Sequence, residues 1–215
     1  MKYRAVIFDL DGTLLDTLTD LALSVNAVLR KHGYPEHQVD AYRYFVGEGI
    51  QVMVQRAVPS GVEGELLDQL VEEVSQEYSR RWDENTSSYP GIPELLDYLH
   101  SLEVPMAVFS NKPHHFAVLT VEKLLPRWRF QEIRGVDEKT PRKPNPAGAL
   151  QIAENLSMPP REIAYLGDTA TDMKTAVAGG MFPVGVLWGF RPARELQEHG
   201  AQLLLEHPRE AKNLF

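Results

Sequence analysis

The feature that most constrains the fold is an alternation of helical and strand-like patterns after residue 88. Strand-like segments are short apolar runs, and the helical ones repeat apolar residues every three or four positions. Helices are predicted at 91–102, 113–125, 145–156 and 169–180, and strands at 6–8, 104–110, 129–135, 162–168 and 182–188. Strands separated by helices form a parallel sheet covered on both faces. We therefore predict an α/β fold with a doubly wound, Rossmann-like core.

The stretch between the first strand and this alternation has a helical pattern only. Apolar residues recur at helical spacing from Leu18 to Leu29 and again from Leu66 to Trp82. We therefore predict two domains, an α/β core formed by residues 1–14 and 86–215 and an α-helical domain, residues 15–85, inserted into it.

Composition excludes several classes of protein. The 30 acidic residues outnumber the 22 basic ones, and the net charge of -8 argues against binding to nucleic acid or to an anionic membrane. The chain has no cysteine, so it has no disulfide, thiolate metal site or cysteine nucleophile. No apolar run reaches the length of a membrane span and no signal peptide is visible. We expect a cytoplasmic protein; the sequence leaves its oligomeric state open.

Charged and polar residues follow the predicted strands. Asp9 and Asp11 come directly after the first strand, Ser110 and Asn111 end the second, and Asp168 ends another. Lys143 lies in a loop just before a helix. The carboxyl ends of parallel strands share one edge of a sheet, where α/β proteins hold their ligands. The side chains are therefore expected to converge, although they are spread over most of the chain.

Each of these residues also has a structural explanation. Asp9 and Asp11 fit a calcium-binding loop poorly, because Thr13 and Leu14 replace its third acidic ligand and its glycine. Asp168 could cap the following helix, and the negative charge of Asp172 could interact favourably with the positive N-terminal end of that helix's dipole. Ser110 and Asn111 could be turn residues, and Lys143 a solvated lysine. The combination of motifs is what favours a functional site.

The segments DLDGTL, SN, RKPNP and GDTATD, in this order and with a helical insertion after the first, resemble the haloacid dehalogenase-like phosphohydrolase superfamily. The likeness covers essentially the whole chain and implies that the inserted domain is a cap. The segments FVGEGIQVMVQRAV, SNKP and VLWGF are further similar to the phosphoglycolate phosphatase group within that superfamily.

The resemblance implies a role for each motif residue. Asp9 would attack phosphorus to form an aspartyl-phosphate, and Asp11 would protonate the leaving oxygen and then activate water. Ser110 and the backbone N–H of Asn111 would donate hydrogen bonds to the phosphoryl oxygens, and Lys143 would supply a mobile positive charge to them and restrain the nucleophile. Asp9, the Asp11 backbone carbonyl and Asp168 would hold Mg²⁺. Asp172, four residues after Asp168, would bind the ion directly or through water.

The implied function is a magnesium-dependent phosphomonoester hydrolase acting on a small phosphorylated metabolite, with phosphoglycolate as the first candidate. The cap would then set selectivity. Gly47 and Gly49 offer backbone N–H groups to an anion near a helix start, Arg56 and Arg43 offer positive charge, and Glu48 opposes it.

Other reactions share this framework. A haloacid dehalogenase would lack Asp11, and a phosphonoacetaldehyde hydrolase would need a cap lysine, for which Lys31 is poorly placed. A β-phosphoglucomutase-like isomerase is the enzymatic alternative, because it also forms an aspartyl-phosphate. A non-catalytic binding protein on the same fold is the alternative from another class.

Overall fold

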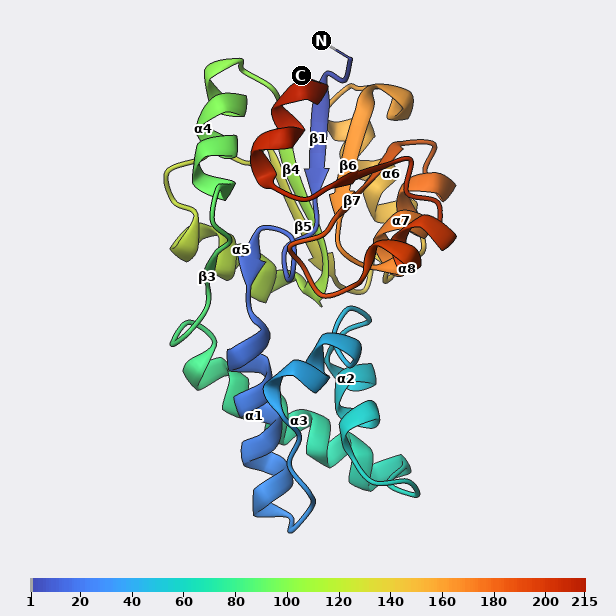
Figure 1. The fold of residues 1–215 in the computed structure, drawn as a ribbon. Helices are drawn as coiled ribbons and strands as arrows, with labels where there is room; N and C mark the ends of the chain where they lie inside the picture. The colour runs from blue at the N-terminus through green and yellow to red at the C-terminus, as the bar shows by residue number, and fades with distance from the viewer. Residues whose placement is uncertain (1) are drawn as a thin grey trace. The chain divides into compact units, whose positions relative to one another are not determined.

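The structure is a computed structural model that describes residues 2–215. It divides the chain into two compact units (Figure 1). The α/β unit contains the residues up to Leu15 together with Ser88–Phe215, and the helical unit contains Asp16–Ser87. Two short strands, β2 (Leu15–Asp16) and β3 (Ser87–Ser88), pair where the chain passes between the units.

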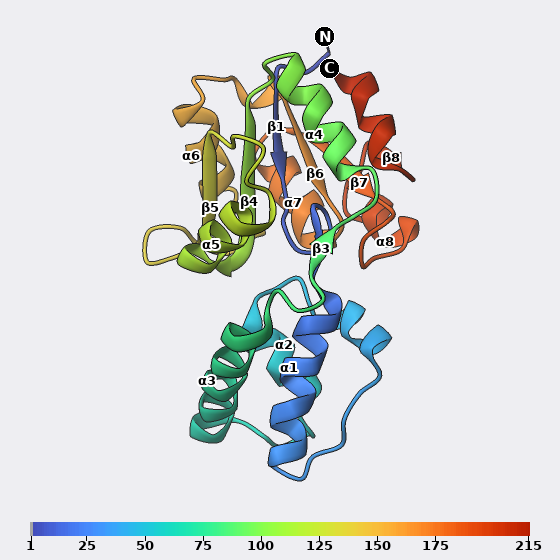
Figure 2. The ribbon, with the colours of Figure 1, turned by 90° about the vertical axis from the view of Figure 1, so that its left-hand side faces the viewer.

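The α/β unit is built on a six-stranded parallel sheet, which confirms the predicted fold class. The strands lie in the order β5-β4-β1-β6-β7-β8, as Figure 2 shows. Their bounds are β1 Ala5–Phe8, β4 Met106–Pro113, β5 Glu132–Val136, β6 Ile163–Gly167, β7 Phe182–Val186 and β8 Leu203–Leu205. The central strand β1 pairs with β4 on one side and with β6 on the other.

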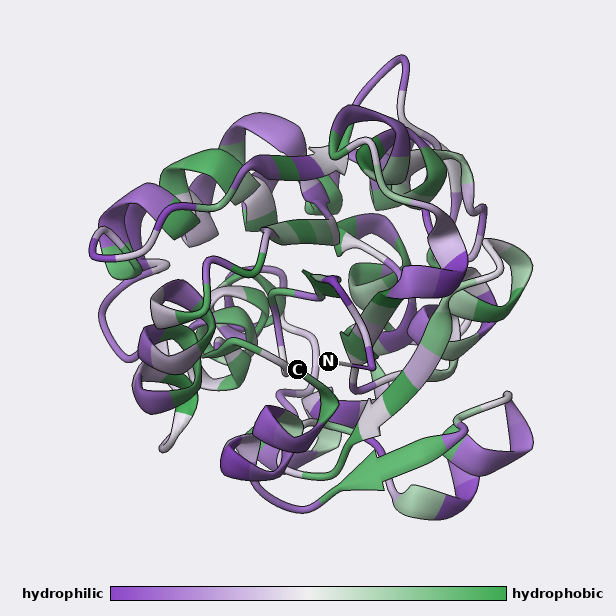
Figure 3. Cartoon of the chain, turned by 90° about the horizontal axis from the view of Figure 1, so that it is seen from above, coloured by the Kyte–Doolittle hydropathy of each residue, from purple (hydrophilic) through white to green (hydrophobic). Residues whose placement is uncertain are grey.

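Both faces of the sheet are apolar, as the continuous hydrophobic runs predict. Successive side chains of a strand point to opposite faces. Val6 and Phe8 pack with α4 (Ile92–Ser101), α5 (His114–Leu124) and the 3-10 helix η3 (Pro208–Leu214). Ala5 and Ile7 pack with α6 (Ala147–Asn155) and α7 (Ala170–Ala178). The helices carry hydrophobic and hydrophilic stretches in turn, because one side of each faces the sheet (Figure 3).

The helical unit contains α1 (Leu18–Lys31), η1 (Val39–Tyr44), α2 (Ile50–Ala57) and α3 (Gly64–Arg81). Its two ends are tied together by Asp20, a fully buried carboxylate in the first turn of α1. Asp20 accepts hydrogen bonds from the backbone N–H groups of Asn85 and Thr86, at 2.9 to 3.1 Å, and from both side chains. Charge on Asp20 is therefore compensated where the chain enters and leaves this unit.

Two local features differ from the prediction. β4 continues to Pro113, three residues past its predicted end. The C-terminal part adds α8 (Ala193–Glu198), β8 and η3, which are too short to show a periodicity in the sequence. Over residues 2–215, no helix is both long and apolar enough to cross a bilayer.

Candidate active site

Asp9 follows β1 directly and is buried at the carboxyl end of the central strand. Its backbone N–H still donates to the Leu166 carbonyl, at 2.9 Å, so its position is fixed by the sheet. The Leu10 N–H donates to Asp9 Oδ1 at 2.7 Å. The chain then turns sharply at Gly12, which has a φ of +89°, a backbone conformation that residues with a Cβ atom rarely adopt. A short loop therefore holds Asp9 and Asp11 at the edge predicted for them.

Lys143 reaches the same place from the loop before α6. Its Nζ lies 2.8 Å from Asp9 Oδ1 and 2.7 Å from Asp172 Oδ1, and it donates to the Phe109 carbonyl at 3.1 Å. Burial on its own would lower the pKa of Lys143, but the carboxylates of Asp172 and Asp9 outweigh it and hold that pKa well above the ordinary value. Lys143 is therefore a permanent positive charge beside Asp9.

Asn111 fixes the Lys143 loop. Its side-chain oxygen accepts the Lys143 N–H at 2.8 Å, and its side-chain nitrogen donates to the Lys143 carbonyl at 3.4 Å. Ser110, the residue before it, is also buried, and its hydroxyl oxygen accepts the Lys112 N–H at 3.2 Å. The side chain of Asn111 thus orients Lys143, which the sequence did not predict.

Asp168 is fully buried at the end of β6. Its carboxylate accepts hydrogen bonds from the Thr13 hydroxyl at 3.1 Å and from the Phe190 N–H at 2.8 Å. Gly12 and Gly189 enclose it so closely that a Cβ atom at either position would overlap its side chain. Burial, reinforced by Asp172, raises the pKa of Asp168 to about 7.

Asp172 has two structural roles. With Thr169 as the N-cap of α7, it completes a capping box in which its Oδ2 accepts the Thr169 N–H at 3.1 Å. Its Oδ1 is the oxygen that pairs with Lys143. The alternative explanation for Asp168 as a helix cap is wrong, because Thr169 holds that position.

Three buried carboxylates meet at this edge, and their charge suits a cation. Oxygen atoms of Asp9, Asp168 and Asp172 lie within 4.8 Å of one another. Burial, with the charge of Asp172, holds the pKa of Asp9 well above its ordinary value despite the opposing charge of Lys143. Were all three carboxylates ionised, one ammonium would leave an excess of negative charge in a desolvated place, which a bound cation would offset. The oxygen donor set is the type that Mg²⁺ prefers, so the residues present fit this ion.

Asp11 stands apart from this carboxylate cluster. Its two oxygens lie 3.0 and 3.1 Å from the Nζ of Lys112, at the end of β4. Sequence reasoning gave Lys112 no role. If the strand had been predicted to continue to Pro113, its alternation would have placed Lys112 on the same face as Ser110.

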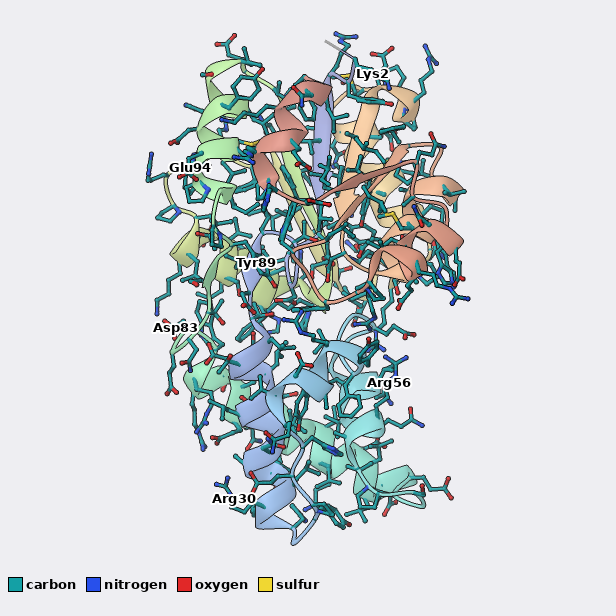
Figure 4. All side chains as sticks on the ribbon, in the orientation of Figure 1. Lys2, Arg30, Arg56, Asp83, Tyr89 and Glu94 are labelled. Atoms are coloured by element: carbon teal, nitrogen blue, oxygen red, sulfur yellow. The ribbon has the colours of Figure 1, made fainter. Side chains whose placement is uncertain are left out.

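The predicted cap residues lie in the helical unit. Gly47 has a φ of +120°, and Gly49, with a φ of +89°, is the N-cap of α2. Arg56, on α2 (Figure 4), forms an ion pair with Glu48 and donates to the carbonyls of Tyr44 and Phe45, each at 3.3 Å. Arg43 pairs with Asp40 at 2.7 Å. The positive charge of Arg56 is thus compensated by Glu48, and Arg56 fastens the loop that contains Gly47.

Comparison with known proteins identifies the family. The family model of haloacid dehalogenase-like hydrolases matches residues 6–186. The chain therefore belongs to this family, as its motifs predicted.

The relatives in this family indicate a phosphatase. The phosphoglycolate phosphatase of Chromobacterium violaceum is 33% identical over 216 residues, covering 99% of this chain and 96% of that protein. The phosphoglycolate phosphatase of Pseudomonas savastanoi pv. phaseolicola is 32% identical over 208 residues, covering 94% and 76%. A crystal structure from Lactobacillus delbrueckii subsp. bulgaricus has a TM-score of 0.93 at 30% identity and covers 99% of this chain and 98% of its own.

Proposed function

We propose that this protein is a magnesium-dependent phosphomonoester hydrolase that acts through a phosphorylated Asp9. The observation that carries the proposal is the convergence of Asp9, Lys143, Asp168 and Asp172 at one edge of the sheet, with oxygen atoms of the three carboxylates within 4.8 Å of one another. Residues so far apart in the sequence are brought together only by the parallel topology.

Asp9 is the proposed nucleophile. The Leu10 N–H and the Lys143 ammonium both contact its Oδ1 and hold the carboxylate in one orientation. Attack on phosphorus divides hydrolysis into two displacements. Lys143 opposes the repulsion between a carboxylate and an anionic phosphoryl group, since it remains charged, and Ser110 offers the group a hydroxyl.

Asp9, Asp168 and Asp172 are the side chains proposed to hold Mg²⁺, together with the Asp11 backbone carbonyl. When bound, the ion would neutralise charge on the transferring phosphoryl group. The carboxylates of Asp9 and Asp168 would then be ionised, because a nearby cation offsets the burial that raises their pKa values. Lys143 bridges Asp9 and Asp172 and offsets the repulsion between their carboxylates.

Asp11 is the proposed general acid and base. Its carboxylate lies outside the carboxylate cluster and pairs with Lys112; in the proposed mechanism it protonates a leaving alkoxide and afterwards removes a proton from water. Two aspartates, two residues apart, would thus have different roles because they have different surroundings.

Phosphoglycolate is the first candidate substrate. The support is the phosphoglycolate phosphatase activity named for relatives that match almost the whole chain. Gly47, through its backbone N–H, and Arg56 are the proposed contacts for a substrate carboxylate. Because Glu48 already pairs with Arg56, a substrate anion would have to compete with it.

The decisive experiment is a panel of phosphomonoesters assayed with Mg²⁺ for released phosphate. A hydrolase releases one phosphate for each ester consumed, and phosphoglycolate should have a higher kcat/KM than hexose phosphates and nucleoside monophosphates. Interconversion of sugar phosphates with little release would instead indicate a mutase. Binding without turnover of any ester would indicate a non-catalytic protein.

A further inference from the structure

Two lysines reach the predicted site, and each contacts a different aspartate of the DLDGTL segment. Lys143 lies 2.8 Å from Asp9, whereas Lys112 lies 3.0 and 3.1 Å from the two oxygens of Asp11. Only 5% of the Lys112 side chain and 14% of the Asp11 side chain are exposed to solvent. A buried ammonium that meets both oxygens of one carboxylate fixes the direction of that carboxylate.

The backbone of Lys112 is itself held rigidly. It belongs to β4, its N–H donates to the Ser110 hydroxyl at 3.2 Å, and its carbonyl packs so closely on Gly135 of β5 that no Cβ would fit there. The Nζ of Lys112 also lies 5.6 Å from the centre of the Phe116 ring, on α5, which is within the range of a cation–π contact. The ammonium therefore has a defined position, whereas Asp11 lies on the loop that follows β1.

We propose that Lys112 is a positioning residue for Asp11: it holds the carboxylate that transfers the proton in the hydrolysis proposed above. A general acid must come within about 2.6–3.2 Å of the atom it protonates. A misplacement of roughly 1 Å can reduce the rate by about 10²-fold. Asp11 follows a strand end and could adopt several side-chain rotamers, so a rigidly held partner restricts it to one.

The first test compares Lys112→Met with the wild type on two substrates. Methionine keeps the length and removes the charge. With an alkyl phosphate, whose leaving group needs a proton, kcat/KM should fall about tenfold or more, since acid–base catalysis contributes roughly 10²- to 10⁴-fold. With p-nitrophenyl phosphate, whose leaving group needs none, kcat/KM should fall much less. The two substrates are compared by kcat/KM because it excludes the later hydrolysis of phosphorylated Asp9, which is the same for both. Lys174→Met, the same change at an exposed position of α7, is the matched control.

The second test uses the absence of cysteine from the chain. In Lys112→Cys, the single thiol can be alkylated with 2-bromoethylamine, which restores an ammonium at nearly the original length. This treatment should restore the turnover of the alkyl phosphate. Alkylation with iodoacetamide, which adds a neutral group, should not. A purely structural role would not respond to the charge of the added group.

The outcomes separate this inference from the proposed function. If Asp11→Asn shows the leaving-group-selective loss but Lys112→Met does not, the positioning role is wrong and the hydrolase mechanism stands. Equal losses of kcat/KM on both substrates with Lys112→Met would also overturn it, because Lys112 would then act on something other than leaving-group protonation. If the wild type hydrolyses no phosphomonoester, the proposed function itself has failed.

In an Asp11→Asn background, Lys112→Met should cause little further loss with the alkyl phosphate, because residues that act as one unit are not additive. Multiplicative losses would show that Lys112 acts independently of Asp11 and would contradict the proposal. Thermal unfolding of each variant shows whether it is folded under the assay conditions.

Discussion

The candidate site residues of the two units differ in how their charges are placed. In the α/β unit, Asp9, Lys143, Asp168 and Asp172 are buried, and Lys143 is shared between two carboxylates. In the helical unit, the ion pair of Arg56 with Glu48 joins partly exposed side chains close in sequence. Buried charges perturb one another strongly, whereas exposed pairs contribute little. This difference supports placing the proposed chemistry in the α/β unit.

The largest effect should come from Asp9. Asp9→Asn preserves the shape of the side chain but removes the nucleophilic charge, so kcat should fall by at least about 10³-fold for every substrate. Phosphate release under saturating substrate measures the loss. The matched control is Asp16→Asn, an exposed aspartate near the same loop, which should retain activity. Near-normal turnover by Asp9→Asn would remove the basis for assigning the chemistry to the buried cluster.

Asp11 should give the next largest effect, and a selective one. Asp11→Asn should reduce kcat/KM for an alkyl phosphate by about 10²-fold, since leaving-group protonation is lost, and should reduce it much less for p-nitrophenyl phosphate. Magnesium affinity should remain, because the ligand proposed at this position is the backbone carbonyl. Parallel kinetics on both substrates provide the measurement, and equal losses would argue against an acid–base role.

A smaller effect is expected in the helical unit. Arg56→Gln should raise KM for phosphoglycolate by about tenfold. A charge-assisted hydrogen bond contributes roughly 1.5–3 kcal/mol, and the expected effect is at the lower end of this range because Arg56 already pairs with Glu48. The kcat value should change little. Glu48→Gln should have the opposite effect on KM, since it releases Arg56. If both variants raise KM equally, Arg56 only stabilises the loop that contains Gly47 and does not bind the substrate.

The smallest effect is on stability, and its sign follows from Asp168. The pKa of Asp168, about 7, lies above its ordinary value of 3.8, so the folded metal-free protein binds this proton more tightly than the unfolded chain does. Its contribution to stability is complete at low pH and is lost as pH rises from about 4 to about 7. Mg²⁺ competes with the proton and should raise Tm by a few degrees more at about pH 8 than at about pH 5.

Thermal unfolding with and without Mg²⁺ at both pH values tests this prediction. Asp168→Asn, which cannot ionise, should show a smaller response to Mg²⁺ and a weaker dependence on pH. An equal rise in Tm at both pH values, or an unchanged response in the variant, would contradict a magnesium site at Asp168.

Much of the α/β unit could be predicted from the sequence, because apolar runs alternate with helical periods over a long stretch. The strand ends beside Asp9 and Asp168 followed from the same pattern, whereas Ser110 lies within β4, which ends three residues later. The contact of Lys112 with Asp11 could not be predicted, because it depends on β4 continuing past Asn111. The residues there are polar and include a proline, and such a segment normally ends a strand.

The capping box of Asp172 and the pairing of Arg56 with Glu48 show the same limit. Each depends on side-chain geometry at a helix end, and several residues nearby could have served equally well. The short elements α8 and β8 were missed because a segment of so few residues shows no hydrophobic periodicity in the sequence. Packing against the rest of the sheet, rather than their own sequence, specifies them.

The proposed mechanism requires Asp9 in the α/β unit to be phosphorylated during turnover, and rapid quenching can detect this intermediate. The enzyme is mixed with phosphoglycolate and Mg²⁺, quenched in acid within a turnover and reduced with borohydride, which converts an aspartyl-phosphate to homoserine. Peptide mapping should find homoserine at position 9 and nowhere else, in an amount that rises and falls with turnover. Product formation with no modification at position 9, or with modification at another carboxylate, would contradict the account.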